Sequence, residues 1–513
     1  MKKTSICIIG AGPAGLINLA TLTRDLDMSN WDIELYERSS RFGGAWAWQD
    51  SDFTSTSTKY ATQFASYVKF TTDDGFFHGQ EYGEYLTSFI EDSGIGDRIH
   101  LNSEVTHCSR KDKGWSVAIN NGEPKDFDYL ILCSGLANRP KRQLDYMSNF
   151  KELDSKTEAL QDKTILIVGG GESAVDVAAR YSKNNKIIFS LKSGIRLSPR
   201  MHPIRGVPSD YLRNELLLRV KETWRNFIGD KFVRTVKKIY TTIQKWTIPK
   251  EKIWHTTDKD KRRQIEMELL DNAKDELYNV FHTKNDDFLK NPHNVEVWGP
   301  VIEHTESSVT LKRISRDETT EIRPDYFVNG IGFLSSMDYL GDQIQVADFV
   351  YGVVHKSDPT VFLGGFARPV IGNIPTICEL QARWISDIIQ QKCIRPTLSD
   401  WEIDRATQKR KYPTINTDAV YPTDMYPYCE TLGRRLRIKG GASKFKELLT
   451  PFSTLRYFPT PENMALIEKS PVFMPRLFYI LLWWMPKEKL RCILPAPANA
   501  DSQSIGDSTK QLP

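Results

Sequence analysis

The sequence predicts an α/β fold in which two domains each carry a parallel sheet. Apolar residues 5–9 form a predicted strand that runs into a glycine-rich turn at 10–15, and residues 163–168 form another that runs into a similar turn at 169–174. A helix-forming stretch follows each turn. Glycines in such units allow a tight turn and a close approach to a pyrophosphate, which the helix dipole also attracts. Two units in one chain predict two Rossmann-like domains and two bound dinucleotides.

The first turn has a suitable residue at each position that a dinucleotide requires. Gly10 permits the tight turn, Gly12 lets the backbone approach the pyrophosphate, and Gly15 lets the helix pack close to the strand. The next strand, at 32–36, is followed by an acid at about the 20-residue separation where the ribose-binding carboxylate is expected. A glycine-rich turn in an ordinary α/β domain is the alternative. The predicted binding residues are Gly10, Gly12, Pro13, Ala14, Gly15 and Glu37.

The second turn is followed by basic residues instead of an acid. The strand at 186–190 leads into a basic loop, with Arg200 further along the chain. Basic residues in place of the acid accommodate the 2′-phosphate of NADP, so NADPH is the predicted second dinucleotide. A solvated basic loop is the alternative. The residues predicted to contact this dinucleotide are Gly169, Gly171, Ser173, Lys192 and Arg196.

The composition is that of a globular protein. The chain has 513 residues, of which 40% are hydrophobic and 26% charged, with a net charge of +4. This length suggests roughly two to four domains, and the nearly balanced charge gives no basis for nucleic-acid binding. The seven cysteines are scattered without a C-x-x-C pair, so neither a structural metal nor a redox disulfide is expected. The amino-terminal apolar run is interpreted as the first strand and not as a signal peptide, so we expect a cytoplasmic protein.

A loop that follows Glu37 is similar to the signature of a known family. It contains Arg38, the pair Gly43 and Gly44, and then Trp46. This spacing resembles the E-R-x-x-x-x-G-G-x-W motif of flavin-containing monooxygenases and Baeyer-Villiger monooxygenases. A structural loop with a Gly-Gly turn is the alternative.

The resemblance runs from residue 4 to about residue 390, and one of the family's motifs is missing within it. Segments 129–135 and 325–333 are similar to the crossovers by which the family leaves and re-enters its FAD domain. Segment 361–384 is similar to the strand and helix that close the FAD site. Segment 150–155 stands in place of the family's F-x-G-x-x-x-H motif and lacks both the glycine and the histidine. The missing motif bears on the subfamily to which the chain is assigned more than on its predicted fold.

By this resemblance the chain is a monooxygenase that binds FAD in its first domain and NADPH in its second. The family inserts one oxygen atom from O2 into a soft nucleophile through a C4a-hydroperoxyflavin, which implies a small amine or sulfide as substrate. Gln63 stands where many members carry an asparagine at the reactive edge of the flavin, and it is the predicted catalytic residue. Val105 belongs to the predicted FAD-binding residues as well.

Three alternatives stay open at this point. A Baeyer-Villiger monooxygenase would use the same cofactors on a ketone, with Arg368 as the arginine near the flavin. A flavoprotein NADPH oxidase or reductase would share the layout, although a disulfide reductase would need the redox cysteine pair that this chain lacks. A cofactor-binding protein without activity is suggested by Gln63 and by the missing motif.

The predicted organisation has five parts. They are the first part of the FAD domain (1–160), the NADPH domain (161–335) with a helical insertion (209–281), the second part of the FAD domain (336–395), a C-terminal extension (396–495) and a disordered tail (496–513). The apolar stretch at 477–485 is shorter than the roughly 20 residues of a membrane span and suits an interfacial anchor or a core helix. Peripheral membrane contact is therefore one of two interpretations, and the oligomeric state is not predicted.

Overall fold

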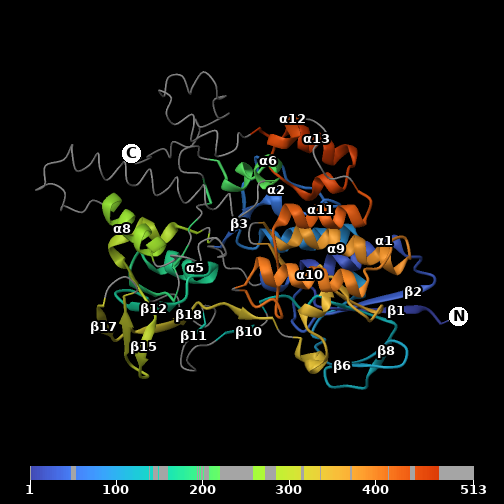
Figure 1. Cartoon of the computed structure of the whole chain (residues 1–513), viewed down its shortest axis with the longest axis horizontal. Coiled ribbons are helices and arrows are strands. Elements are labelled where there is room, and N and C mark those ends of the chain that lie inside the picture. The colour runs from blue at the N-terminus through green and yellow to red at the C-terminus, as the bar shows by residue number, and fades with distance from the viewer. Residues whose placement is uncertain are drawn as a thin grey trace, which may run out of the picture.

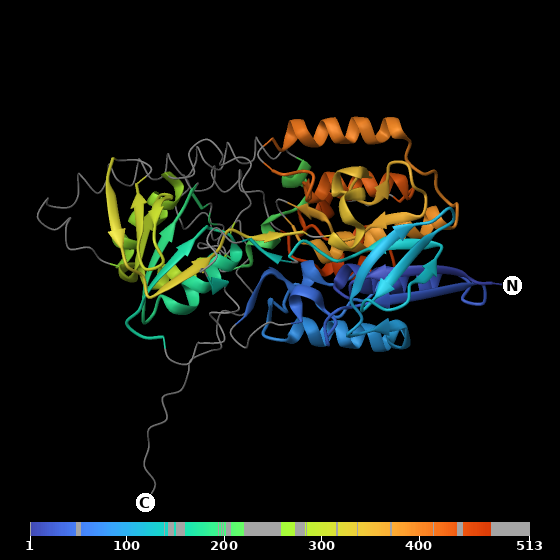
Figure 2. The same ribbon diagram turned by 90° about the horizontal axis from the view of Figure 1, so that it is seen from below.

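The structure is a computed structural model that describes most of the chain between residues 2 and 472. Within that range it leaves out 48–52, 138, 142–147, 150–159, 193, 196, 198–199, 202–206, 220–257, 272–282, 284, 314–316, 336, 370–371, 414 and 439–444. The two predicted sheets lie in separate parts of the molecule, as Figures 1 and 2 show from two directions.

The first domain is built on a seven-stranded sheet whose central strands are parallel. Across the sheet the strands are β20 (Phe349–Val350), β21 (Val354–His355), β22 (Val361–Leu363), β9 (Tyr129–Leu132), β1 (Thr4–Ile9), β2 (Trp31–Tyr36) and β5 (Ile99–His100). The helices α1 (Pro13–Asp25) and α9 (Ile374–Ile389) pack side by side in this domain. Because a central parallel strand is buried on both faces, residues 6–9 of β1 are a continuous apolar run in place of an alternating one.

The second domain is built on a smaller sheet in which all neighbouring strands are parallel. The order is β11 (Ser148–Asn149), β18 (Tyr326–Asn329), β12 (Thr164–Val168), β13 (Lys186–Ser190) and β14 (Val295–Trp298). One face packs against α5 (Glu172–Tyr181) and α8 (Asp258–Asp271), and the other against β15 (Val301–His304), β16 (Val309–Lys312) and β17 (Thr319–Ile322). The predicted α/β class with two parallel-sheet domains is confirmed.

Two of the crossings between the domains lie next to each other. After β9 the chain leaves the first domain through β10 (Arg139–Pro140), and after β18 it returns through β19 (Phe333–Leu334). These two strands pair antiparallel, with Arg139 opposite Leu334. The segments that resemble family crossovers therefore end where the chain changes domain.

Smaller elements complete the first domain. They are β3 (Thr54–Thr58), α2 (Lys59–Thr62), β4 (Phe76–His78), α3 (Glu81–Asp92) and the antiparallel sheet of β6 (Val105–Arg110), β7 (Trp115–Ile119) and β8 (Lys125–Phe127).

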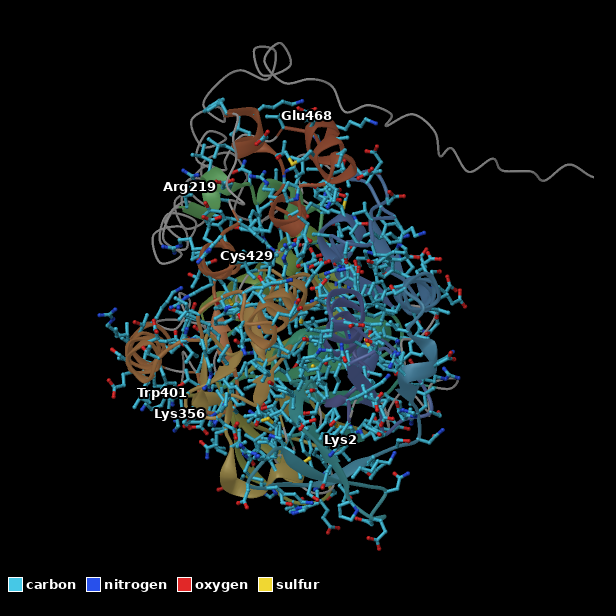
Figure 3. The ribbon with its side chains drawn as sticks, turned by 90° about the vertical axis from the view of Figure 1, so that its right-hand side faces the viewer. Lys2, Arg219, Lys356, Trp401, Cys429 and Glu468 are labelled. Atoms are coloured by element: carbon cyan, nitrogen blue, oxygen red, sulfur yellow. The ribbon has the colours of Figure 1, made fainter. Side chains whose placement is uncertain are left out.

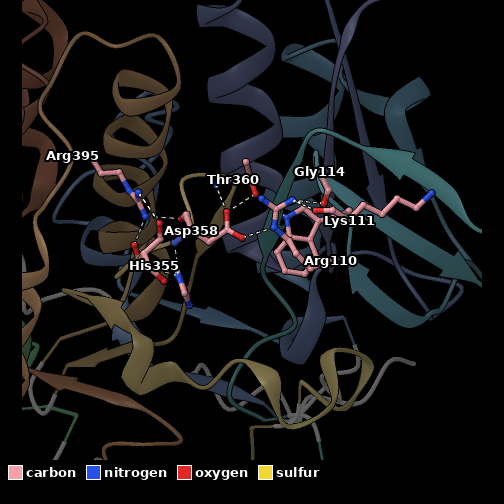
Figure 4. Close-up of polar contacts among 9 residues, drawn as sticks. Arg110, Lys111, Gly114, His355, Asp358, Thr360 and Arg395 are labelled. Carbon is pink, nitrogen blue, oxygen red and sulfur yellow. Dashed lines mark hydrogen bonds and ion pairs between the residues drawn. The ribbon is translucent and has the colours of Figure 1, made fainter.

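A polar network, shown in Figure 4, fixes that antiparallel sheet to the loop before β22. Arg110 Nε donates to Asp358 Oδ2 at 2.7 Å, and the backbone N–H and hydroxyl of Thr360 donate to Asp358 Oδ1. Trp115 Nε1 donates to the Thr360 hydroxyl at 3.0 Å. Although burial raises the pKa of Asp358, the hydrogen bonds from Thr360 and the charge of Arg110 lower it overall, so the carboxylate stays ionised.

The C-terminal segment up to residue 472 packs into the core of the first domain. Its elements are α10 (Leu398–Lys411), β24 (Tyr421–Thr423), α11 (Met425–Arg435), α12 (Phe445–Leu449) and α13 (Pro461–Lys469). Cys429, Leu455 and Tyr457 belong to the same buried cluster as β1 and α1. β24 also pairs in parallel with β23 (Ala367–Pro369). The predicted extension is thus continuous with the first domain over its described part, as the positions of Cys429 and Glu468 in Figure 3 illustrate.

Only the two ends of the predicted insertion are described. At its start, α6 (Glu215–Arg219) packs against α11 and α12 of the first domain. Towards its end, α8 packs on the second domain through Ile265 and Leu269. The middle of the insertion, 220–257, and the apolar stretch at 477–485 lie outside the described residues. None of the helices in the described part of the chain is long and apolar enough to cross a membrane.

Candidate functional site

Two glycines of the first turn are required by the fold itself. Gly10 has a φ of +103°, and a Cβ at this position would lie 2.6 Å from the carbonyl oxygen of Cys133. A Cβ at Gly15 would lie 1.8 Å from the carbonyl oxygen of Gly10. The first contact is with the chain after β9, and the second is between helix and turn. Gly10 and Gly15 would therefore be needed whether or not a ligand binds.

Gly12 is different, because none of the described residues requires a glycine there. Its φ of −74° and ψ of 176° are extended backbone that any residue adopts, and the nearest atom to an added Cβ is the Cα of Gly44, 3.8 Å away. Gly12 is also the N-cap of α1, with Pro13 in the first turn and no side chain that caps the helix. Uncapped N–H groups beside open space are what a pyrophosphate requires, so the turn fits a dinucleotide.

Glu37 lies beside this turn, as the spacing predicts. The carboxylate is buried at the end of β2 and accepts hydrogen bonds from Ala11 N at 2.8 Å and from Ser39 N at 2.9 Å. The Ser39 hydroxyl donates to the same oxygen as Ser39 N, at 2.8 Å. Since a carboxylate has about four acceptor positions, Glu37 keeps acceptor capacity on Oε2 for a ribose hydroxyl.

The Gly-Gly loop folds back on the turn. Gly43 N donates to Ala11 O at 2.7 Å, and both Gly43 and Gly44 have positive φ values. A Cβ at Gly44 would lie 3.1 Å from the Cα of Gly12, so this loop approaches the turn closely. The motif that resembles the flavin monooxygenases therefore forms one wall of the same site.

The remaining residues predicted to bind FAD have varied surroundings. Ala14 is buried on the first turn of α1, and the Arg38 side chain is exposed. Trp46 packs against Tyr82, with ring centroids 4.5 Å apart. Val105 is buried at the start of β6 in the main core. Their contacts with FAD stay predictions.

The Gln63 amide is engaged in its own loop. It is 1% exposed; its Nε2 donates to Phe70 O at 2.7 Å, and its Oε1 accepts from Lys69 N at 2.9 Å and from Phe70 N at 2.8 Å. A carboxamide has two N–H groups and two lone pairs on its oxygen, so a single N–H is left. Any contact of Gln63 with a flavin would have to use that group, and its catalytic role stays a prediction.

Glu379, which the sequence analysis did not single out, anchors the same region. Its buried carboxylate on α9 accepts hydrogen bonds from Ala65 N at 2.5 Å and Ser66 N at 2.8 Å. Asn463 of α13 donates to Ala65 O at 2.9 Å. Burial raises the pKa of Glu379, and the hydrogen bonds from Ser66 and Ala65 oppose that shift. In the sequence Glu379 is one of several polar residues of this helix, beside Gln381 and Arg383, and no local pattern identifies its partners.

The second turn has the same division of roles as the first. Gly169 has a φ of +107°, and a Cβ there would lie 2.4 Å from Gly330 O. Gly171, the uncapped N-cap of α5, has a φ of −77°, and among the described residues the atom nearest to an added Cβ is Gly330 O at 3.8 Å. Ala174 replaces the third glycine, and Gly330 makes room for it, since a Cβ on Gly330 would lie 2.7 Å from the Ala174 methyl. The second turn therefore fits a second dinucleotide.

The basic residues after β13 separate into two groups. Lys192 is exposed directly after the strand, and Ser173 is partly exposed on the first turn of α5, so both remain predicted contacts. Arg196 lies outside the described residues. Arg200, in contrast, does not belong to the phosphate site.

Arg200 instead joins the two domains. Its guanidinium donates to Thr54 O at 2.7 Å and to Ser55 O at 3.1 Å on β3 of the first domain. On the second domain it faces Asp287 at 3.5 Å and Asp176 at 3.8 Å. The expectation that Arg200 adds to the basic loop is corrected, because these contacts leave its side chain mostly buried. Arg368, the arginine of the Baeyer-Villiger alternative, is exposed on β23 and interacts electrostatically with Glu172 of α5.

Two parallel-sheet domains, each with an uncapped glycine turn, define a protein of the two-dinucleotide class. The chain belongs to the pyridine nucleotide-disulphide oxidoreductase family, whose model matches residues 7–263. It is 25% identical over 489 residues to the 4-hydroxybenzoate brominase (decarboxylating) of Pseudoalteromonas luteoviolacea, covering 91% of this chain and 89% of that protein. It is 24% identical over 474 residues to flavin-containing monooxygenase 3 of Rattus norvegicus, covering 82% of each chain.

Solved structures share the fold. S-allyl-L-cysteine S-oxygenase from Allium sativum matches with a TM-score of 0.55 and 14% identity, over 92% of this chain and 96% of that one. The complex of OTEMO with FAD and NADP matches with a TM-score of 0.58 and 13% identity, over 85% and 98%. The predicted resemblance to flavin monooxygenases is confirmed, and so is the prediction that the chain is an oxidoreductase. The six cysteines in the described part of the chain are all free.

Proposed function

We propose that this protein is an FAD- and NADPH-dependent monooxygenase that transfers one oxygen atom of O2 to the nitrogen of a small amine or the sulfur of a sulfide. The observation that carries the proposal is the pair Gly12 and Gly171, two glycines that the fold does not need, each at the uncapped start of a helix. Flavin-containing monooxygenase 3 and an S-oxygenase among the similar proteins support the type of reaction.

The described residues have distinct roles in this proposal. The turn with Gly12, the carboxylate of Glu37 and the Gly43–Gly44 loop hold FAD, and the turn with Gly171 holds NADPH together with Lys192. Bound FAD, reduced by NADPH, supplies the activation of O2. The chain supplies position and exclusion of water, since residues 63–65 are buried and Ala65 is held by side chains of α9 and α13.

The proposal is tested with the purified protein. We expect a flavin absorbance spectrum, and NADPH oxidation that a tertiary amine or a thioether accelerates with formation of the N-oxide or S-oxide. A cyclic ketone tests the alternative, which the fold of cyclohexanone monooxygenase (TM-score 0.55, 15% identity) keeps open. Lactone formation without oxygenation of the amine or the thioether would favour the Baeyer-Villiger reaction and contradict the proposal.

Lys192 and Arg196 are predicted to distinguish NADPH from NADH. A hydrogen bond to a charged group contributes about 1.5–3 kcal/mol, so Lys192→Ala/Arg196→Ala should raise the KM for NADPH by at least about tenfold. The KM for NADH should change little, because NADH lacks the 2′-phosphate. The control is Lys183→Ala, which removes an exposed lysine that lies before β13, whereas Lys192 lies after it. An equal loss with both nucleotides would show that the basic loop supports the fold.

Gln63 is predicted to affect how tightly NADPH oxidation is coupled to oxygenation of the substrate. Gln63→Ala should retain flavin and NADPH oxidation, because these depend on the two glycine turns, but should release more hydrogen peroxide per oxygenated product. Loss of one hydrogen bond, about 1–3 kcal/mol, corresponds to a roughly tenfold to hundredfold shift in this ratio. The assay is run well below the unfolding temperature of the variant, since Lys69 N and Phe70 N also lose their acceptor. Unchanged coupling together with lower stability would mean that Gln63 only holds its loop.

A further inference from the structure

A buried amide in the second domain has no hydrogen-bond partner among the described residues. Asn329 is the last residue of β18 and is 6% exposed. Within the described part of the chain, neither its Nδ2 nor its Oδ1 has a partner. Burial of an unpaired amide is unfavourable, so buried polar side chains in native proteins almost always have partners. The position of Asn329 therefore calls for a ligand that supplies them.

Two other buried polar side chains at this sheet have hydrogen-bond partners within the protein. Asn185, which precedes β13, accepts from Lys163 N at 3.0 Å and donates to Leu160 O at 2.8 Å. The hydroxyl of Ser190, at the end of β13, donates to Gly299 O at 3.0 Å. Asn329 thus differs from Asn185 and Ser190, which are similarly buried in the same domain. Asn185 provides a matched control for substitution.

The strand order indicates which part of a dinucleotide would lie near Asn329. In the sheet, β12 lies between β13 and β18. The turn with Gly171 follows β12, and Lys192 follows β13. A dinucleotide lies across the carboxyl ends of such strands, with its pyrophosphate at the helix N-terminus. Its 2′-phosphate half therefore lies towards β13, and its nicotinamide half towards β18.

Asn329 lies at the carboxyl-terminal edge of the parallel sheet, where the dinucleotide is expected to bind. It is paired in register with Val168, the last residue of β12, and the next residue, Gly330, donates its N–H to Val168 O at 2.7 Å. Gly330 in turn adjoins the glycine turn, since its carbonyl oxygen would lie 2.4 Å from a Cβ on Gly169. The unpaired amide is thus one residue away from the backbone that borders the turn.

We propose that the Asn329 amide binds the nicotinamide half of NADPH. This inference rests on the proposed function, because it takes NADPH as the second dinucleotide. The Asn329 amide offers both a hydrogen-bond donor and an acceptor. The nicotinamide carboxamide and the ribose hydroxyls can bind to both, whereas the phosphates of the other half can only accept. The sequence departs from the family's crossover at the two positions after Asn329, where Gly330 and Ile331 stand.

The first test compares two ligands on the FAD-loaded protein by calorimetry. NADP+ carries the nicotinamide half, whereas adenosine 2′,5′-bisphosphate carries only the other half. Asn329→Leu should weaken NADP+ binding by about tenfold, the typical effect of a lost hydrogen bond, and leave adenosine 2′,5′-bisphosphate unchanged. Equal weakening of both ligands, or no weakening of either, would overturn the proposal.

The second test measures thermal unfolding without nucleotide. Because Leu has the shape of Asn and removes an unpaired polar group, Asn329→Leu should leave the Tm unchanged or raise it. Asn185→Leu should lower the Tm, since it leaves Lys163 N and Leu160 O unpaired. A fall in Asn329→Leu as large as that in Asn185→Leu would overturn the proposal. If the unmodified protein bound neither ligand, the assignment of NADPH to the second domain would fail. If the unmodified protein and Asn329→Leu bound both ligands equally well, only the role of Asn329 would fail.

Discussion

Gly12→Val is expected to yield a folded protein without flavin. The extended backbone at Gly12 suits a β-branched residue, and the space around it holds no atom nearer to an added Cβ than Gly44 Cα at 3.8 Å. The new side chain would instead occupy the position that the pyrophosphate needs. Flavin content, measured as visible absorbance relative to protein absorbance, should fall close to zero. The Tm should match that of wild-type protein stripped of FAD, because lost ligand alone lowers the Tm of a holoprotein.

Two controls separate ligand loss from misfolding. Gly171→Val makes the same change at the second turn, and it should retain FAD while losing NADP+ binding. Gly10→Val should fail to fold, because a Cβ there would lie 2.6 Å from Cys133 O and its φ is +103°. Full flavin occupancy in Gly12→Val would contradict the assignment of the first turn.

Arg456→Met is expected to cost on the order of 3 kcal/mol of unfolding free energy, as is typical when one partner of a buried ion pair is removed. The Arg456 side chain is 4% exposed and its partner Glu215 is 0% exposed, with Nη1 2.5 Å from Oε2. Arg456 also donates to Glu447 O and to the Thr450 hydroxyl. The pair joins α6, at the start of the predicted insertion, to the C-terminal segment. Denaturant unfolding measures the loss.

The matched control is an exposed ion pair. Arg24 is paired with Asp25 at 2.8 Å but is 55% exposed, so Arg24→Met should cost less than about 1 kcal/mol. The double variant Arg456→Met/Glu215→Gln should lose less stability than the sum of the two single variants, because both changes remove the same ion pair. Arg219 Nη2, 2.6 Å from Glu215 Oε1, still neutralises the carboxylate in Arg456→Met. Equal effects of Arg456→Met and Arg24→Met would show that the C-terminal segment is held by its apolar contacts alone.

The sequence by itself determined the class of the fold and the location of the two turns. Strand, glycine turn and helix are local patterns, since each glycine position is set by residues within a few positions along the chain. Glu37 was predicted for the same reason, because one βαβ unit sets its distance from the turn. The structure confirms the two parallel sheets and places Glu37 beside Ala11.

Only the tertiary structure decided what individual residues in those patterns do. It separates Gly10, which the chain after β9 requires, from Gly12, which no protein atom requires. It sets Ala174 of α5 against Gly330, which follows β18. It also places Arg200 between the domains instead of beside a phosphate.

The anchoring of the loop at 63–70 was equally beyond the sequence. Glu379 reaches Ala65 and Ser66 from more than 300 positions away, and Asn463 reaches Ala65 from the C-terminal segment. Gln63, in turn, binds the backbone of its own loop. Apolar periodicity and glycine spacing record how a segment folds locally. A single polar side chain can accept many partners, and which one it meets depends on how distant segments pack together.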